Sequence, residues 1–333
     1  MRIVLAEAMG MCFGVRDALA AMRGVERPVA VTVMGELVHN PAVNREVAGR
    51  GFRVMASAEG PLPATAEALI TAHGISDAVR GRLAGAGIRT IDTTCPLVRR
   101  AHAAAQRLVG EGRFLIVLGK RGHVEVQGLI GDVSPEGCAV VEHGGEVRRW
   151  PEGRLGVIAQ TTFVEREARE IVERIRELNC GADVAFVNTI CAPTRERQTA
   201  LARLVEQIDV LVVVGGRRSN NTRQLVQAGI SAGVRVLHIE SATELRTEAF
   251  VAEDVVGVTA GTSTLDETVG EVVSVLRSFC GNGVDGERAV LKASAKAVRL
   301  AESSEDVRRG DAEGTAGAES NSNDGLKRRE IVM

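Results

Sequence analysis

The sequence predicts an α/β fold with largely parallel sheets, built as three modules of similar size and followed by a disordered tail. Three observations support this prediction: short β-branched runs recur along the chain, helical apolar patterns lie between them, and cysteines recur at similar intervals. Strands that alternate with helices are typical of α/β layers with parallel sheets. A length of 333 residues is enough for more than one domain.

The predicted strands are short runs rich in valine, isoleucine and leucine. Several of them are apolar throughout rather than alternating, as expected for strands that are covered on both faces. The runs comprise residues 3–5, 29–33, 69–71, 114–118, 157–159, 184–187, 210–214, 234–239 and 255–259.

The predicted helices carry apolar residues at intervals of three and four positions, which places these residues on one face. Val15, Leu19 and Met22 share such a face, and similar patterns occur at residues 164–175 and 201–208. Each helix is therefore expected to pack one face against a sheet.

The spacing of three cysteines suggests where the modules begin and end. We predict α/β lobes at residues 1–94 with Cys12, 95–190 with Cys95 and 191–280 with Cys191, and a mostly disordered tail at 281–333. The later part of the tail has almost no large apolar residues, so it lacks the material for a core.

Composition excludes several classes of protein. The net charge is −2, aromatic residues make up only 2% of the chain, and tyrosine is absent. Proteins that read nucleic acid by stacking bases carry more aromatic rings and a basic surface. No apolar run is long enough to span a bilayer, and the N-terminal segment is too lightly charged for a signal peptide. We therefore expect a cytoplasmic protein with no nucleic-acid or membrane partner, whose cysteines are thiols, metal ligands or catalytic groups.

Cys12, Cys95 and Cys191 each lie between a predicted strand and a predicted helix. Such junctions line the ligand crevice of open α/β sheets, and the positive end of a helix stabilises a thiolate. Three thiolates from distant segments suit an iron–sulfur cluster with one open iron, or a catalytic zinc ion. The alternative is three small buried residues, which explains one cysteine better than three in matching positions. That alternative is preferred for the remaining cysteines, Cys138, Cys180 and Cys280.

Polar side chains occupy the other strand–helix junctions. Imidazoles, hydroxyls, amides and helix N-termini can together hold a phosphate or diphosphate. Ordinary helix capping is the alternative for each residue, but three of the six histidines lie at such junctions. The polar junction residues include His39, His73, His123, Thr161, Ser219, Asn220, Asn221 and Ser263.

Glu125 lies two residues after His123 in the same junction. Burial raises the pKa of a carboxyl group, and a buried Glu125 would be a plausible proton donor. The alternative is a surface acid in the first turn of a helix.

Taken in order, these motifs resemble the 4-hydroxy-3-methylbut-2-enyl diphosphate reductase (IspH or LytB) family. The resemblance covers the chain from its start to about Cys280 and implies a three-lobed α/β trefoil around a central [4Fe–4S] cluster. The motifs, in the family's order and spacing, are GMCFGV, VHNP, AHGIS, DTTCPLV, GHVEV, AQTT, ICAPTRERQ, VVVGGRRSNNTRQL and TAGTS.

The resemblance also implies a role for each site residue. Cys12, Cys95 and Cys191 match the cluster ligands, one from each lobe, and leave one iron open. Glu125 matches the proton-delivering glutamate, with Thr161 nearby to position the substrate hydroxyl. The residues that match the diphosphate contacts are His39, His73, His123, Ser219, Asn221 and Ser263. Asn220 replaces a serine common in the family but is kept as a contact, because an amide also donates to an anionic oxygen.

The implied enzyme is an oxidoreductase that removes an allylic hydroxyl group and yields isopentenyl and dimethylallyl diphosphate, the last step of the non-mevalonate pathway. No Gly-Xaa-Gly-Xaa-Xaa-Gly motif follows a predicted strand, so the electrons are expected from a ferredoxin or flavodoxin. Two alternatives stay open at this point: a zinc hydrolase of phosphate esters, and a non-catalytic redox or iron sensor.

Overall fold

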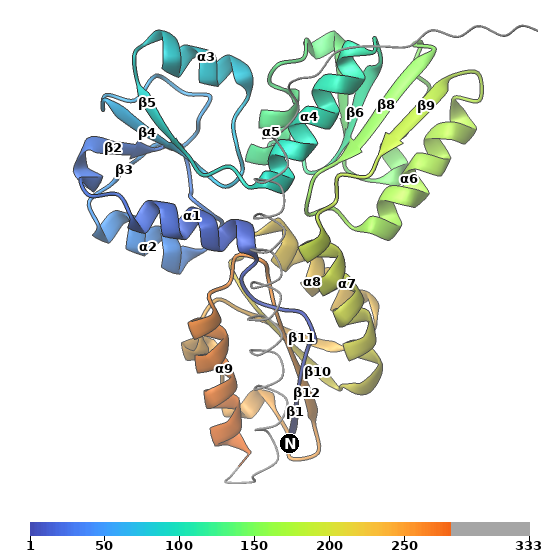
Figure 1. Ribbon diagram of the computed structural model, residues 1–333. Helices are drawn as coiled ribbons and strands as arrows, with labels where there is room; N and C mark the ends of the chain where they lie inside the picture. The colour runs from blue at the N-terminus through green and yellow to red at the C-terminus, as the bar shows by residue number, and fades with distance from the viewer. Residues whose placement is uncertain (281–333) are drawn as a thin grey trace, which may run out of the picture. The chain divides into compact units, whose positions relative to one another are not determined.

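The computed structural model describes residues 1–280, and the predicted tail at 281–333 lies outside the described residues. The described part contains three separate four-stranded sheets, each entirely parallel and each covered by helices. Figure 1 shows these sheets as three lobes, which confirms the α/β trefoil expected from the sequence.

The first sheet has the order β3-β2-β4-β5. Its strands are β2 (Val31–Val33), β3 (Arg53–Val54), β4 (Glu67–Ile70) and β5 (Arg89–Asp92). The helices α1 (Phe13–Arg23) and α2 (Pro41–Gly49) share one apolar core with this sheet, and α3 (Asp77–Gly85) shares another. The expected face of α1 forms part of the first core, since Val15, Leu19 and Met22 are all buried there.

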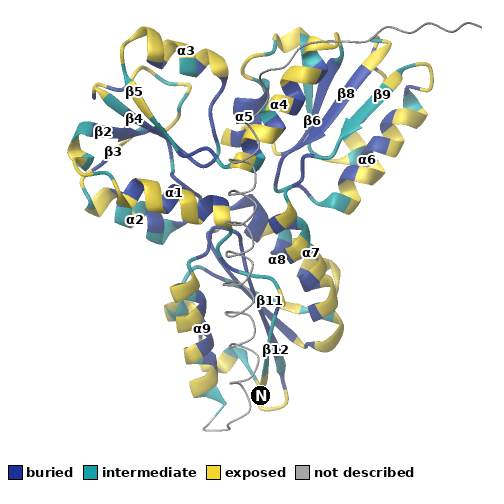
Figure 2. Ribbon diagram, viewed as in Figure 1, coloured by how far each residue is buried: buried dark blue, intermediate teal, exposed yellow. Residues whose placement is uncertain are grey.

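The second sheet has the order β7-β6-β8-β9. Its strands are β6 (Phe114–Leu118), β7 (Cys138–Val141), β8 (Arg154–Ala159) and β9 (Asp183–Val187). The helices α4 (Pro96–Gly110) and α5 (Val124–Ile130) pack in one core, and α6 (Glu165–Leu178) packs in the other. The central strands are buried on both faces, as their uninterrupted apolar sequences predicted (Figure 2).

The third sheet has the order β1-β12-β10-β11. Its strands are β1 (Arg2–Leu5), β10 (Val210–Val214), β11 (Arg235–Ile239) and β12 (Val255–Ala260). The helices α7 (Ala192–Leu204) and α8 (Asn220–Ser231) pack in one core, and α9 (Asp266–Phe279) packs in the other. Short 3₁₀ turns complete the chain: Pro28–Ala30, Pro135–Gly137, Gly144–Glu146, Val205–Gln207, Ala242–Glu244 and Thr247–Ala249.

One expectation about the lobes needs correction. The first lobe was expected to include the N-terminal strand, but β1 pairs in parallel with β12 from Arg2↔Val255 to Leu5↔Val258. Its side chains Ile3 and Leu5 pack into the core beside α9. Burial of these apolar groups determines where the strand lies, and the first lobe retains only the strands after residue 30. The other lobe boundaries stay a prediction.

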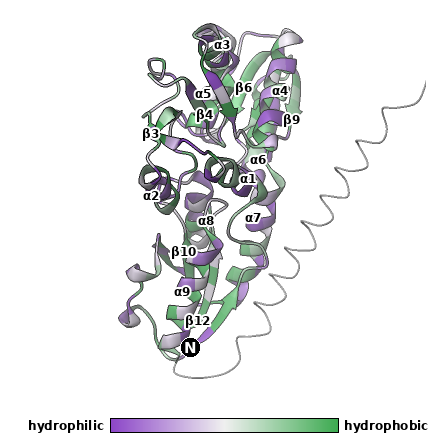
Figure 3. Cartoon of the chain, turned by 60° about the vertical axis from the view of Figure 1, so that its left-hand side comes forward, coloured by the Kyte–Doolittle hydropathy of each residue, from purple (hydrophilic) through white to green (hydrophobic). Residues whose placement is uncertain are grey.

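An edge position is shared by the strands that are absent from the predicted β-branched runs. β3, β5 and β7 each lie at the edge of a sheet and are short or partly exposed. The apolar signal is weak in the two-residue β3 and the polar β5, whereas central strands are strongly hydrophobic (Figure 3). The strand β7 is apolar throughout, but it is short and lies at an edge. Among the described helices, none is both long enough and apolar enough to cross a membrane.

Candidate functional site

A cavity of about 90 Å³ receives side chains from all three lobes. Every site residue expected from the sequence lines this cavity: Cys12, His39, His73, Cys95, His123, Glu125, Thr161, Cys191, Ser219, Asn220, Asn221 and Ser263. Parallel strands bring their carboxyl ends to one edge of each sheet, and these edges meet at the cavity. The other cysteines, Cys138, Cys180 and Cys280, do not line it.

The three cysteines occupy equivalent local positions. Cys12, Cys95 and Cys191 are the N-cap residues of α1, α4 and α7, respectively. All three are free and partly buried. The sequence therefore predicted the helix starts correctly and placed each sulfur at the amino end of a helix.

Burial, rather than the helix N-terminus, dominates the acidity of these thiols. Burial raises the pKa of Cys95 and raises that of Cys191 to about 11, although a contact of 3.1 Å between Cys191 Sγ and Thr194 Oγ1 acts in the opposite direction. Helix position alone predicted a stabilised thiolate. This prediction is wrong for Cys95 and Cys191 in the protein without a bound cation. A cationic ligand would lower both pKa values, because it favours the charged form.

Gly14 allows α1 to approach Cys95 closely. A Cβ atom at position 14 would lie 2.5 Å from Cys95 Sγ and 3.1 Å from Cys95 Cβ. Any larger side chain would therefore displace the sulfur. No role was predicted for this glycine, although it belongs to the GMCFGV motif.

The three histidines form a compact group. The ring centroids of His39 and His73 are 4.4 Å apart, and His123 lies 5.1 Å from the first and 5.7 Å from the second. Burial, together with the neighbouring His39, lowers the pKa of His73 well below its usual value and lowers that of His123 to about 3. Both rings are consequently neutral at pH 7.

Hydrogen bonds fix two of these rings. Nδ1 of His123 accepts the backbone N–H of Glu125 at 3.1 Å, so the neutral ring carries its proton on Nε2. Nδ1 of His39 lies 2.7 Å from the Glu36 carboxylate, whose other oxygen binds Arg218 at 2.6 Å. The hydrogen bond from His39 lowers the pKa of Glu36. Glu36 was missed by sequence analysis, although it lies only three residues before His39.

The third lobe supplies hydroxyl and amide groups. Ser219 caps α8 by accepting the Thr222 N–H, and Asn220 donates to Thr162 Oγ1 at 2.9 Å. Asn221 accepts the Thr262 N–H through its oxygen, but its buried Nδ2 has no hydrogen-bond partner in residues 1–280. The buried Nδ1 of His73 is also unpartnered there. Buried polar groups are normally paired, so both nitrogens point to a polar ligand.

Glu125 is the buried acid of the cavity, with 2% of its surface exposed. One carboxylate oxygen accepts the Thr161 N–H at 2.6 Å, and the other accepts the Thr161 hydroxyl at 2.9 Å. Burial nevertheless raises the pKa of Glu125 to about 7. At neutral pH the group is therefore close to half protonated, as a proton donor requires.

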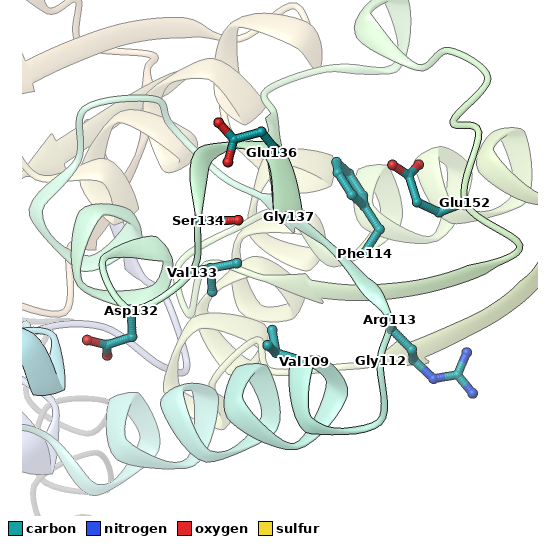
Figure 4. Close-up of a pocket in the computed structure, with 10 residues that line it drawn as sticks. All are labelled: Val109, Gly112, Arg113, Phe114, Asp132, Val133, Ser134, Glu136, Gly137 and Glu152. Atoms are coloured by element: carbon teal, nitrogen blue, oxygen red, sulfur yellow. The ribbon is translucent and has the colours of Figure 1, made fainter.

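A second cavity of about 310 Å³ lies in the second lobe, next to the end of α4 and the start of β6. It is larger, but it contains no cysteine or histidine. Its acidic side chains Asp132, Glu136 and Glu152 point in different directions and do not converge on one point (Figure 4). The smaller cavity is therefore the candidate functional site.

Comparisons with known proteins show a family for this chain. Residues 3–277 match the family described as LytB protein. The chain is 35% identical over 289 residues to 4-hydroxy-3-methylbut-2-enyl diphosphate reductase from Solidesulfovibrio magneticus, covering 84% of this chain and 100% of the relative. The enzyme of that name from Geobacter sulfurreducens is 34% identical, with 84% of this chain and 98% of the relative covered.

Two solved structures share the fold. The E-1-hydroxy-2-methyl-but-2-enyl-4-diphosphate reductase from Plasmodium falciparum has a TM-score of 0.76 at 24% identity, over 86% of this chain and 93% of that protein. A second structure, described as (E)-4-hydroxy-3-methyl-but-2-enyl diphosphate reductase, the terminal enzyme of the non-mevalonate pathway, has a TM-score of 0.58 at 31% identity. It is matched over 84% of this chain and 100% of its own length.

Proposed function

Because this chain belongs to the LytB protein family, we propose that it is a 4-hydroxy-3-methylbut-2-enyl diphosphate reductase. The proposed reaction yields isopentenyl and dimethylallyl diphosphate as the last step of the non-mevalonate pathway. It consumes two electrons and two protons: the allylic C–O bond breaks, a C–H bond forms, and the hydroxyl group leaves as water. The observation that carries the proposal is one cavity that combines three thiols, three imidazoles and a buried acid.

Cys12, Cys95 and Cys191 would hold one [4Fe–4S] cluster and leave one iron without a protein ligand. When bound, this group supplies one-electron transfer and an open Lewis-acidic iron. All three thiols line one cavity, which supports this assignment, and cysteine thiolates are the usual ligands of such clusters. Metal analysis separates the cluster from the zinc hydrolase alternative.

His39, His73 and His123 would bind the diphosphate, together with Ser219, Asn220, Asn221 and Ser263. The unpartnered nitrogens of His73 and Asn221 support this assignment, because each is available to an anionic oxygen. Asn220 also donates to Thr162, so its amide is shared between the substrate and the second lobe. A diphosphate at this position would favour protonation of the neutral imidazoles and so strengthen its own binding.

Glu125 would donate the protons, and Thr161 would position both this carboxyl group and the substrate hydroxyl. A pKa of about 7 keeps the acid available for donation near neutral pH. The buried walls of the cavity would exclude bulk water from the anionic stage of the reaction.

An external protein would deliver the electrons, and we propose a ferredoxin or flavodoxin acting in the cytoplasm. No Gly-Xaa-Gly-Xaa-Xaa-Gly motif follows a predicted strand, and this supports an external source over a bound nicotinamide or flavin.

Anaerobic purification followed by iron and sulfide analysis tests this proposal. The expected protein is brown, contains iron and inorganic sulfide, and turns over 4-hydroxy-3-methylbut-2-enyl diphosphate with a chemical reductant. Cys12→Ser should lose iron and turnover, whereas Cys180→Ser at an exposed position should keep both. Zinc in place of iron would support the hydrolase alternative. A protein that contains the cluster but does not bind the diphosphate would support the alternative of a non-catalytic redox or iron sensor.

A further inference from the structure

Arg197 is a buried cation in α7, and the proposed reaction assigns it no role. It lies six positions after Cys191, and only 5% of its surface is exposed. Arginine is rarely buried to this degree without a partner of opposite charge. The surroundings of its guanidinium group are therefore informative.

The guanidinium group joins the first turn of α7, next to Cys191, to the loop that precedes Cys12. Its Nη1 donates to the carbonyl oxygen of Pro193 at 2.8 Å, and its Nη2 donates to that of Gly10 at 2.5 Å. Pro193 lies two residues after Cys191, and Gly10 lies two residues before Cys12. One side chain therefore holds together two backbone segments that are far apart in sequence.

The positive charge has no counter-ion in the part of the chain that the structure describes. Within residues 1–280, no carboxylate forms an ion pair with Arg197, and its buried Nε has no hydrogen-bond partner. The ionisable groups that act on it are Cys12, Cys191, the exposed Glu196 and a second cation, Arg16. Of these, the sulfur groups of Cys12 and Cys191 lie at the cavity.

Neutral donors would satisfy the two carbonyl groups as well as a guanidinium does. A buried charge is costly unless it is compensated, so the charge itself needs a reason. Thiolates of Cys12 and Cys191, formed when a metal group binds, would provide the missing negative charge. Arg197 would then be matched to the loaded site rather than to the empty one.

We propose that Arg197 is a positioning residue that holds the loop before Cys12 against the first turn of α7, next to Cys191, and places a fixed positive charge beside the metal group. This inference rests on the proposed iron–sulfur function. A positive charge near a redox group stabilises its reduced form. Arg197 therefore raises the midpoint potential of the bound cluster and makes it easier for a carrier protein to reduce.

Redox titration of the wild-type holoprotein and three variants tests the effect of the charge on the midpoint potential. For Arg197→Gln, we expect at least a tenfold loss in the equilibrium constant for adding one electron, equivalent to a midpoint potential about 59 mV lower. Arg197→Lys keeps the charge and should shift this constant less than threefold. Arg203→Gln is the matched control, because it removes an arginine from the same helix whose side chain is 65% exposed and paired with Glu7. Its potential should equal that of the wild type.

A loaded Arg197→Gln protein with an unchanged potential would overturn the proposal, because a purely structural residue would affect only the yield of loaded protein. A second measurement does not depend on that variant. Wild-type holoprotein labelled with ¹⁵N-arginine should show a nitrogen coupling to the cluster spin in pulsed electron paramagnetic resonance, and Arg197→Lys should lose it. Absence of the coupling in the wild type would equally overturn the proposal.

The wild type also separates this inference from the proposed function. If the wild-type protein contains no iron and sulfide, the proposed function fails together with the role of Arg197. If the wild type is loaded and active but neither the potential nor the coupling depends on Arg197, only the inference fails.

Discussion

The carboxyl group of Glu125 is held at both oxygens by one residue, Thr161, through its backbone N–H at 2.6 Å and its hydroxyl group at 2.9 Å. These contacts favour the carboxylate, yet burial outweighs them and raises the pKa to about 7. The two residues come from different strand–helix junctions of the second lobe, after β6 and β8. Their pairing fixes the acid within the cavity and leaves it able to exchange a proton.

Glu125→Gln should keep the metal group and lose turnover. The amide preserves the shape of the side chain but cannot donate a proton, so we expect kcat to fall by about 10²- to 10⁴-fold. Iron content and steady-state turnover measure the two effects separately. Glu170→Gln, at an exposed position of α6, serves as the control. Turnover within a factor of two of the wild type would remove Glu125 from the reaction.

The same residue should make the metal-free protein less stable at high pH. The pKa of Glu125 is about 7 in the folded protein and near 4.5 when the chain is unfolded, so the folded state binds more protons between these values. The free energy of unfolding therefore falls as pH rises from about 4.5 to 7, by up to about 3 kcal/mol. Urea denaturation at several pH values measures this change, and Glu125→Gln should remove most of it. An identical pH dependence in the variant would contradict the assignment.

Glu36→Gln should weaken diphosphate binding more than it slows the reaction. Glu36 holds His39 at 2.7 Å and also pairs with Arg218 from the third lobe. Loss of a charge-assisted hydrogen bond to His39 should raise KM by about tenfold, with a smaller effect on kcat. Steady-state kinetics checks this split. Glu46→Gln is the matched control, since it removes the same kind of ion pair, to Arg23, in the same lobe but outside the cavity. A fall in kcat alone would contradict a binding role.

Gly14→Ala should reduce iron loading without unfolding the protein. The added methyl group would lie 2.5 Å from Cys95 Sγ, so the sulfur must move. Gly24→Ala at the other end of α1 is the control, because its added methyl group meets only ordinary contacts of 3.5 Å and 3.6 Å. Iron per protein and circular dichroism are the measurements. Full iron loading in Gly14→Ala would contradict this prediction, because it would show that the Cys95 sulfur can move without loss of metal binding.

The sequence by itself determined the local features of this protein. Uninterrupted apolar runs such as residues 210–214 identified the central strands, and the positions of Cys12, Cys95 and Cys191 before helices were correctly inferred. Such features depend on a residue's near neighbours, so periodicity and capping reveal them. Parallel strands end at a common edge of a sheet, so the positions of the polar residues after these strands also predicted that they lie close together. The structure places them at one cavity.

Only the tertiary structure decided what depends on segments far apart in the chain. It placed β1 beside β12, joined Arg197 of α7 to the Gly10 carbonyl group near Cys12, and joined Glu36 to both His39 and Arg218. It also reversed the expected acidity of Cys95 and Cys191, because burial outweighs the helix N-terminus. Desolvation and long-range pairing depend on every atom packed around a group, and a local sequence pattern does not contain that information.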